Sequence, residues 1–155
     1  LARAVLRCFP ILLVAALLPS PYGIRLPPSW GAAGLFLVSF LLGALVVGAF
    51  CMLIYISAFF TISPMGVRVV AVAVVDFFSG AIIPLPFFPE KLQVIFSLLP
   101  FGSMQNVPYR IYGGDLAGLP ALVSILVQII WLLTLLLLGR LMMGKALQRI
   151  IIQGG

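Results

Sequence analysis

The stretch SGAIIPLPFFPEKLQVIFSLLPF, residues 79–101, decides the fold, because it is nearly as apolar as a membrane span and is nevertheless broken by prolines. These are Pro84, Pro86, Pro89 and Pro100. A proline inside a helix removes a backbone donor and clashes with the preceding turn, so one straight helix cannot hold four of them. The chain must therefore turn several times within an apolar segment.

The composition around this stretch is that of an integral membrane protein. Hydrophobic residues make up 64% of the 155 residues and charged residues only 8%, whereas soluble domains average about 25% charged. No charged residue occurs between Leu26 and Val67, nor in the nineteen residues from Ala121 to Gly139. As a helix the second run spans about 28 Å, close to the roughly 30 Å of a bilayer core. The sequence predicts an all-α, polytopic helical membrane protein.

About four transmembrane helices fit these apolar runs within a single domain over residues 1–155. The predicted spans are residues 4–18, 31–60, 67–83 and 116–143. On one side of the four spans lie Arg3, Arg7, Arg68, Arg140, Lys145 and Arg149, and on the other Arg25, Lys91 and Arg110. By the positive-inside rule, both chain ends are expected in the cytoplasm. The basic residues form no dense patch, so the net charge of +6 does not indicate nucleic-acid binding.

Residues 84–114 are predicted to form a re-entrant helical hairpin in the outer leaflet. Its first part, EKLQVIFSLL, places Leu92, Ile95, Phe96 and Leu99 on one helical face. Pro89 suits a helix start, and ten residues reach only about half a bilayer. The alternative is an ordinary extracytoplasmic loop that rests on the membrane. The residues that define the predicted hairpin are Pro84, Pro86, Pro89, Glu90, Phe96 and Pro100.

The sequence lacks the residues of the common catalytic and cofactor sites. It has no histidine and no GxxxxGK[ST] phosphate loop, so we expect no catalytic, cofactor or metal site in this chain.

Asp76 is the one ionisable residue well inside a predicted span, where a carboxylate marks a functional or pairing position. The alternative is a hydrated or protonated packing residue. Small residues at four-residue spacings, which let helices approach closely, are Ser39, Gly43, Ala44 and Gly48.

The segment from Asp76 to Phe101 resembles the signature region of the type-two ATP-binding-cassette (ABC) export permeases. In that family a small-residue step and a proline break lead through a short outer-leaflet hairpin. The later YRIYGGDLAG, the long last helix and the tail QRIIIQGG are similar to one bacterial branch, and the resemblance covers nearly the whole chain. The matching elements are Ser79-Gly80, Pro84, Phe88-Pro89-Glu90, Leu92 and Leu98-Leu99-Pro100-Phe101.

The resemblance implies a permease subunit in the bacterial cytoplasmic membrane, with a cytoplasmic C-terminus. It implies a dimer with a second permease copy or homologue, and a separate ABC ATPase that binds ATP and Mg. The family has six spans, so two further spans are expected before Leu1. The implied function is ATP-driven export, and the apolar spans suit a drug or lipid-like substrate. The candidate transport-path or interface residues are Asp76, Ser79 and Gly80.

Two other classes remain open on the sequence. One is a membrane subunit for assembly or anchoring that does not transport. The other is an ATP-independent secondary carrier, which usually shows internal repeats and several polar groups at the midplane of the membrane.

Overall fold

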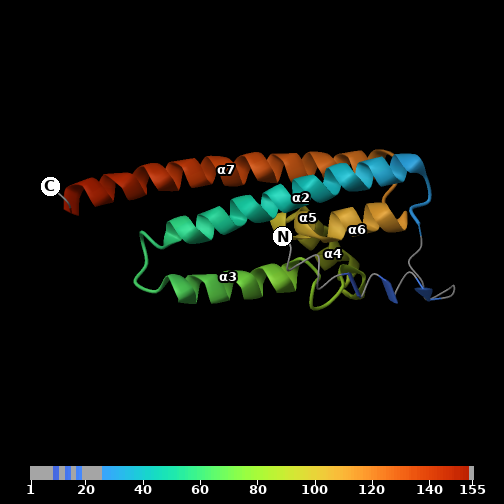
Figure 1. Cartoon of the computed structure of the whole chain (residues 1–155), viewed down its shortest axis with the longest axis horizontal. Helices are drawn as coiled ribbons and strands as arrows, with labels where there is room; N and C mark the ends of the chain where they lie inside the picture. The colour runs from blue at the N-terminus through green and yellow to red at the C-terminus, as the bar shows by residue number, and fades with distance from the viewer. Residues whose placement is uncertain (1–8, 11–12, 15–16, 19–25, 154–155) are drawn as a thin grey trace.

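The computed structural model describes residues 9–10, 13–14, 17–18 and 26–153, and the regular structure in this part of the chain is helical (Figure 1). The all-α prediction is therefore confirmed. The predicted span 4–18 lies largely outside the described residues. The elements are α2 (Trp30–Ser57), α3 (Pro64–Phe78), the 3-10 helix η1 (Leu85–Phe87), α4 (Glu90–Leu98), α5 (Pro100–Met104), α6 (Asn106–Gly113) and α7 (Leu119–Gln153).

Two long helices, α2 and α7, form the frame of the molecule. They contain 28 and 35 residues, and both are long and apolar enough to cross a membrane. They start at the same end of the molecule and run in parallel (Figure 1). Both helices match runs that the sequence predicted as spans, 31–60 and 116–143. The total of four spans stays a prediction.

Helix α3 returns along α2 in the opposite direction (Figure 1). Ser63 caps its start, because the Ser63 hydroxyl accepts a hydrogen bond from the Gly66 amide at 3.3 Å. The helix ends at Phe78, earlier than the predicted end at residue 83. The reason is Gly80, whose φ of +84° turns the chain away from the helix before Pro84 is reached.

The core lies where the short helices meet α2 and α7. One cluster joins Val46 and Ala49 of α2 to Met104 of α5 and Leu135 of α7. A second cluster contains Val107, Ile111, Ala121 and Ile125, from α6 and α7.

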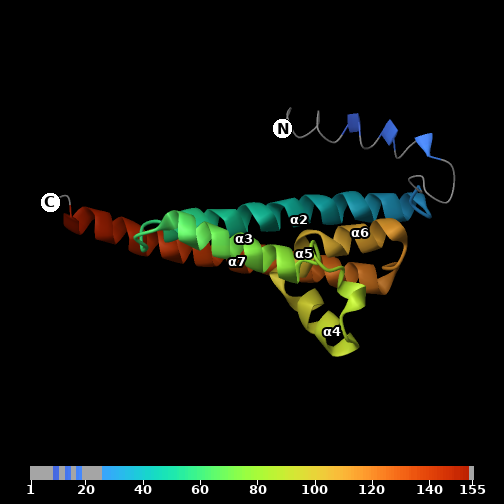
Figure 2. The same ribbon diagram turned by 90° about the horizontal axis from the view of Figure 1, so that it is seen from below.

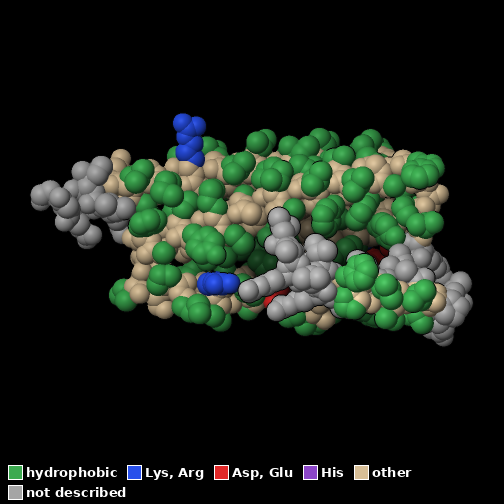
Figure 3. Space-filling model, viewed as in Figure 1, with side chains coloured by type: hydrophobic (Ala, Val, Ile, Leu, Met, Phe, Trp, Pro, Cys, Tyr) green, Lys and Arg blue, Asp and Glu red, His purple; other side chains and the backbone are tan. Residues whose placement is uncertain are grey.

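The outward faces of the long helices stay apolar and exposed, as Figure 3 shows for one side of the molecule. On α7, for example, Leu133 is 61% exposed. An apolar surface of this extent indicates contact with lipid or with another protein.

The predicted hairpin region folds as a chain of short helices. Helix α4 confirms the helix predicted from EKLQVIFSLL, and it projects away from the bundle, whereas α5 and α6 lie against α2 and α7 (Figure 2). Helices α4 and α5 meet closely at Gly102, where an added Cβ would lie 2.6 Å from the Phe96 carbonyl oxygen. Whether this hairpin enters the membrane stays a prediction.

Candidate functional site

Three buried polar residues meet where α5 lies between α2 and α7. The Gln128 side chain of α7 accepts a hydrogen bond from the Ser39 hydroxyl at 3.0 Å. Its Nε2 group donates to the Ser39 carbonyl at 3.1 Å and to the Ser103 carbonyl at 2.8 Å. All three residues are fully buried. We call this group the amide cluster.

The amide cluster provides a hydrogen-bond donor for a backbone carbonyl that has no partner within the short helix α5. Ser103 lies in the last turn of a five-residue helix, and the carbonyls of a last helical turn have no partner within the helix. A buried carbonyl without a partner is costly, so the Gln128 amide fixes α5 to α7. The Ser103 hydroxyl itself has no hydrogen-bond partner among the described residues.

Gly43 of α2 lies close to the backbone of α5, and this contact holds α5 on the side that faces α2. A Cβ added to Gly43 would lie 2.7 Å from the Met104 carbonyl oxygen and 3.2 Å from that of Ser103. Only a glycine permits this distance. The predicted small-residue pattern is thus confirmed at Gly43, but an added Cβ at Gly48 would meet nothing within 4 Å.

An aromatic cluster joins α4 to the end of α3. Phe96 of α4 is 7% exposed, and its ring lies edge-on to three others. The centroid distances are 5.0 Å to Phe78, 5.1 Å to Phe88 and 6.2 Å to Phe77. Such pairs add to the hydrophobic gain of burial, so Phe96 is the central anchor of α4.

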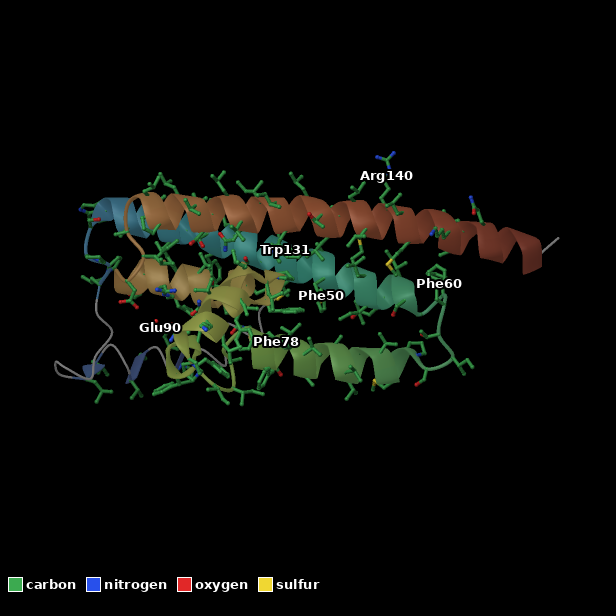
Figure 4. All side chains as sticks on the ribbon, turned by 180° about the vertical axis from the view of Figure 1, so that it is seen from behind. Phe50, Phe60, Phe78, Glu90, Trp131 and Arg140 are labelled. Atoms are coloured by element: carbon green, nitrogen blue, oxygen red, sulfur yellow. The ribbon has the colours of Figure 1, made fainter. Side chains whose placement is uncertain are left out.

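The same cluster extends to α5 and α2. The ring of Phe101 stacks on Phe78 at 5.9 Å and meets the ring of Phe50 edge-on at 5.5 Å. Phe50 and Phe78 face the interior from opposite helices (Figure 4). Contacts between aromatic rings therefore connect α2, α3, α4 and α5.

A second polar contact links α7 to the hairpin. The Trp131 indole N–H donates to the Leu98 carbonyl at 2.7 Å, and Leu98 is the last residue of α4. Trp131 points from α7 toward the hairpin (Figure 4). Gln128 and Trp131 lie about one helical turn apart, so one stretch of α7 holds the ends of both α4 and α5.

The predicted hairpin prolines and Glu90 lie at or near the starts of short elements, whereas Phe96 lies inside α4. Pro84 precedes η1, Pro86 lies within its first turn, Pro89 precedes α4 and Pro100 is the first residue of α5. Glu90 begins α4 and is exposed. Proline at these positions costs no helical hydrogen bond.

The predicted apolar face of α4 is only partly buried within the chain. Phe96 is buried as expected, but Leu92 and Ile95 are 39% and 53% exposed. Helix α4 projects from the bundle, so this face reaches past the elements that could cover it. Gln93, which is not part of the apolar face, donates from Nε2 to the Phe88 carbonyl at 2.7 Å.

The three predicted path residues lie together at the end of α3, and none of them takes part in the hydrogen bonds of the amide cluster. Asp76 is half-buried, and its carbonyl accepts from the Ile82 amide at 3.4 Å. Ser79 is 2% exposed, and its hydroxyl has no partner among the described residues. An added Cβ at Gly80 would lie 3.3 Å from the Leu85 side chain. Their role in a transport path stays a prediction.

The amide cluster was not predicted from the sequence. Gln128 is the only carboxamide in the uncharged run from Ala121 to Gly139, and this was the available signal. A buried amide needs partners, but the sequence does not indicate which segments supply them. Among the described residues, no group of three or more His, Cys, Asp or Glu side chains could hold a metal ion.

The family model described as "ABC-2 family transporter protein" matches residues 3–154. No curated protein and no solved structure matches the chain.

Proposed function

Because the chain belongs to the ABC-2 transporter family, we propose that it is the membrane-spanning permease of an ATP-driven exporter. Its substrate is apolar or amphipathic, in keeping with the apolar surfaces of α2 and α7. A separate ABC ATPase supplies ATP and Mg binding, and the permease pairs with a second copy or a homologue. The predicted role of Asp76, Ser79 and Gly80 beside the path belongs to this proposal.

The proposed orientation places the start of α2 and α7 at the outer face of the bacterial cytoplasmic membrane. The basic residues support it: Arg68 lies near the start of α3, and Arg140 and Lys145 lie in the second half of α7. Arg140 points away from the bundle (Figure 4). Lys and Arg near span ends favour the cytoplasmic side. In this orientation the C-terminus is cytoplasmic, and the hairpin of residues 84–114 enters the outer leaflet as part of a four-span chain.

The main observation in support of the proposal is that the hairpin is hydrogen-bonded to α7 at two points. Gln128 and Trp131 hold α5 and α4 through the Ser103 and Leu98 carbonyls. A tilt of α7 therefore moves the hairpin with it. In the proposed mechanism, ATP binding closes the ATPase pair, α7 tilts, and the hairpin opens the outer end of the path.

The decisive experiment is transport in vesicles that contain the permease and its partner ATPase. We expect export that requires ATP and stops when the ATPase site is disabled by mutation. Export that continues with the disabled ATPase contradicts the ATP-driven mechanism and supports a secondary carrier. Full assembly of the complex without any export of apolar or amphipathic compounds supports an anchoring subunit instead.

A further inference from the structure

Two adjoining hollows lie where α4 and α6 meet the start of α7. The larger, of about 390 Å³, is a groove lined with apolar side chains that include Val107, Val123 and Val127. The smaller, of about 360 Å³, is more polar and is lined by Gln93 and Asp115 among others. Ser97 and Arg110 line both hollows. The two hollows thus adjoin at Ser97 and Arg110 and together give a site with an apolar part and a polar part.

The two serines of the groove add little hydrogen-bonding capacity. The Ser97 hydroxyl donates to the Val94 carbonyl at 2.8 Å, and the Ser124 hydroxyl donates to the Pro120 carbonyl at 2.9 Å. The hydroxyl hydrogens of both serines are therefore used within their own helices, and only the oxygens are left as acceptors.

Opposite charges stand side by side at the polar part. The Leu116 amide donates to the Arg110 carbonyl at 3.1 Å, and this turn brings Asp115 back beside Arg110 in the same hollow. No ion pair joins the two side chains within the described part of the chain. Arg110 is half-buried and Asp115 is exposed. The site thus offers a cation and an anion that do not neutralise each other by direct contact.

The lining of the groove changes from polar to apolar in the direction in which α7 runs. Arg110 lies toward the end of α6, close to the turn that leads into α7, whereas Val123 and Val127 lie one and two turns further along α7. Asn106 lines the groove one turn before Arg110 on α6. A ligand that follows this order has its charges at the start of α7, a polar linkage near Asn106 and an apolar chain along α7.

We propose that this site binds one zwitterionic phospholipid. Its phosphate pairs with Arg110, because a guanidinium matches the oxygens of a phosphate with two parallel hydrogen bonds. Its ammonium group lies toward Asp115, and an acyl chain follows α7 past Val123 and Val127. Phosphatidylglycerol would also satisfy Arg110, but its uncharged glycerol head would leave Asp115 without a cationic partner. The inference depends on the proposed outer-face position of the groove and is independent of ATP-driven export.

The test is native mass spectrometry of the purified full chain with equal amounts of phosphatidylethanolamine and phosphatidylglycerol. We expect the unaltered protein to retain phosphatidylethanolamine preferentially. Arg110→Gln should reduce that retention by about 10-fold, because it removes a charged hydrogen bond. Asp115→Asn should move the preference toward phosphatidylglycerol. Lys91→Gln is the charge control, because Lys91 is exposed on α4 and lines neither hollow.

A second pair of variants tests the apolar part without touching a charge. Val123→Trp should fill the groove and abolish retention of either lipid. Leu122→Trp adds the same side chain at a neighbouring exposed position outside the groove and should leave retention unchanged. Size-exclusion profiles check folding, and this pair decides the question if Arg110→Gln does not fold. Equal retention by Val123→Trp and Leu122→Trp, or a preference of the unaltered protein for phosphatidylglycerol, would overturn the proposal.

Discussion

The Gln128 carboxamide of α7 donates to the Ser103 carbonyl of α5 at 2.8 Å, between residues that are both fully buried. The same carboxamide exchanges two hydrogen bonds with Ser39 of α2. Three helices from distant parts of the sequence are thus fixed at one point. The position of the hairpin depends on this side chain, because α5 is too short to be held by its own helical hydrogen bonds.

Gln128→Leu should destabilise the protein by about 1–3 kcal/mol, because it leaves the Ser39 hydroxyl and the Ser103 carbonyl buried without partners. Thermal unfolding in detergent measures the effect. Thr134→Val is the control, because among the described residues the Thr134 hydroxyl bonds only to the Ile130 carbonyl of its own helix. Equal melting temperatures of the two variants would show that the amide cluster does not hold α5.

Gly43→Ala should also be destabilising, by about 1–3 kcal/mol, because the new methyl group overlaps the Met104 carbonyl oxygen. Backbone atoms cannot move aside as a side chain can, so α5 must shift. Gly48→Ala is the matched control on the same helix, where an added Cβ meets nothing within 4 Å. We expect it to be neutral or slightly stabilising, because alanine favours helix over glycine. A tolerated Gly43→Ala in the same melting experiment would rule out the close contact.

Phe96→Ala should cost about 3–5 kcal/mol of stability, because it removes the central ring of the aromatic cluster and leaves a cavity. Ile95→Ala, at a neighbouring position that is 53% exposed, should have a much smaller effect. Denaturation measures stability, and vesicle export at matched membrane levels measures function. If the hairpin closes the outer end of the path, Phe96→Ala reduces export and Ile95→Ala does not. Similar export by both variants would make the hairpin a connector.

The proposed topology predicts which positions a membrane-impermeant thiol reagent reaches from outside. In a background without Cys8 and Cys51, cysteines at Lys91 and Asp115 should be labelled on intact cells. Cysteines at Met65 and Gln153 should be labelled only after the membrane is opened. Labelling of position 153 but not of position 91 on intact cells would reverse the orientation.

The long elements could be predicted from the sequence because their signal is local. The uncharged runs gave α2 and the apolar part of α7, and the spacing in EKLQVIFSLL gave α4. Pro84 predicts an end of α3 at residue 83, whereas Gly80 already turns the chain after Phe78 with a positive φ. The backbone conformation of a glycine depends on the residues that pack against it, and at Gly80 the neighbour is Leu85.

The candidate site could be predicted only in part, because its contacts join distant segments. Phe96 was expected to be buried, but its partners Phe77 and Phe78 belong to another helix. Gln128 reaches Ser39 across 89 positions of the sequence. Side-chain periodicity shows which face of a helix is apolar, but it does not show which carbonyl a buried amide will meet.

The amide cluster divides α7 unequally, and this has a mechanical consequence. Gln128 lies nine residues after Leu119 and 25 residues before Gln153, so the two arms measure roughly 14 Å and 38 Å. Helix α7 therefore resembles a lever with its fulcrum near one end. A tilt of α7 about Gln128 moves its far tip nearly three times as far as its start, and it turns the hairpin, which is held at Gln128 and Trp131, through the same angle.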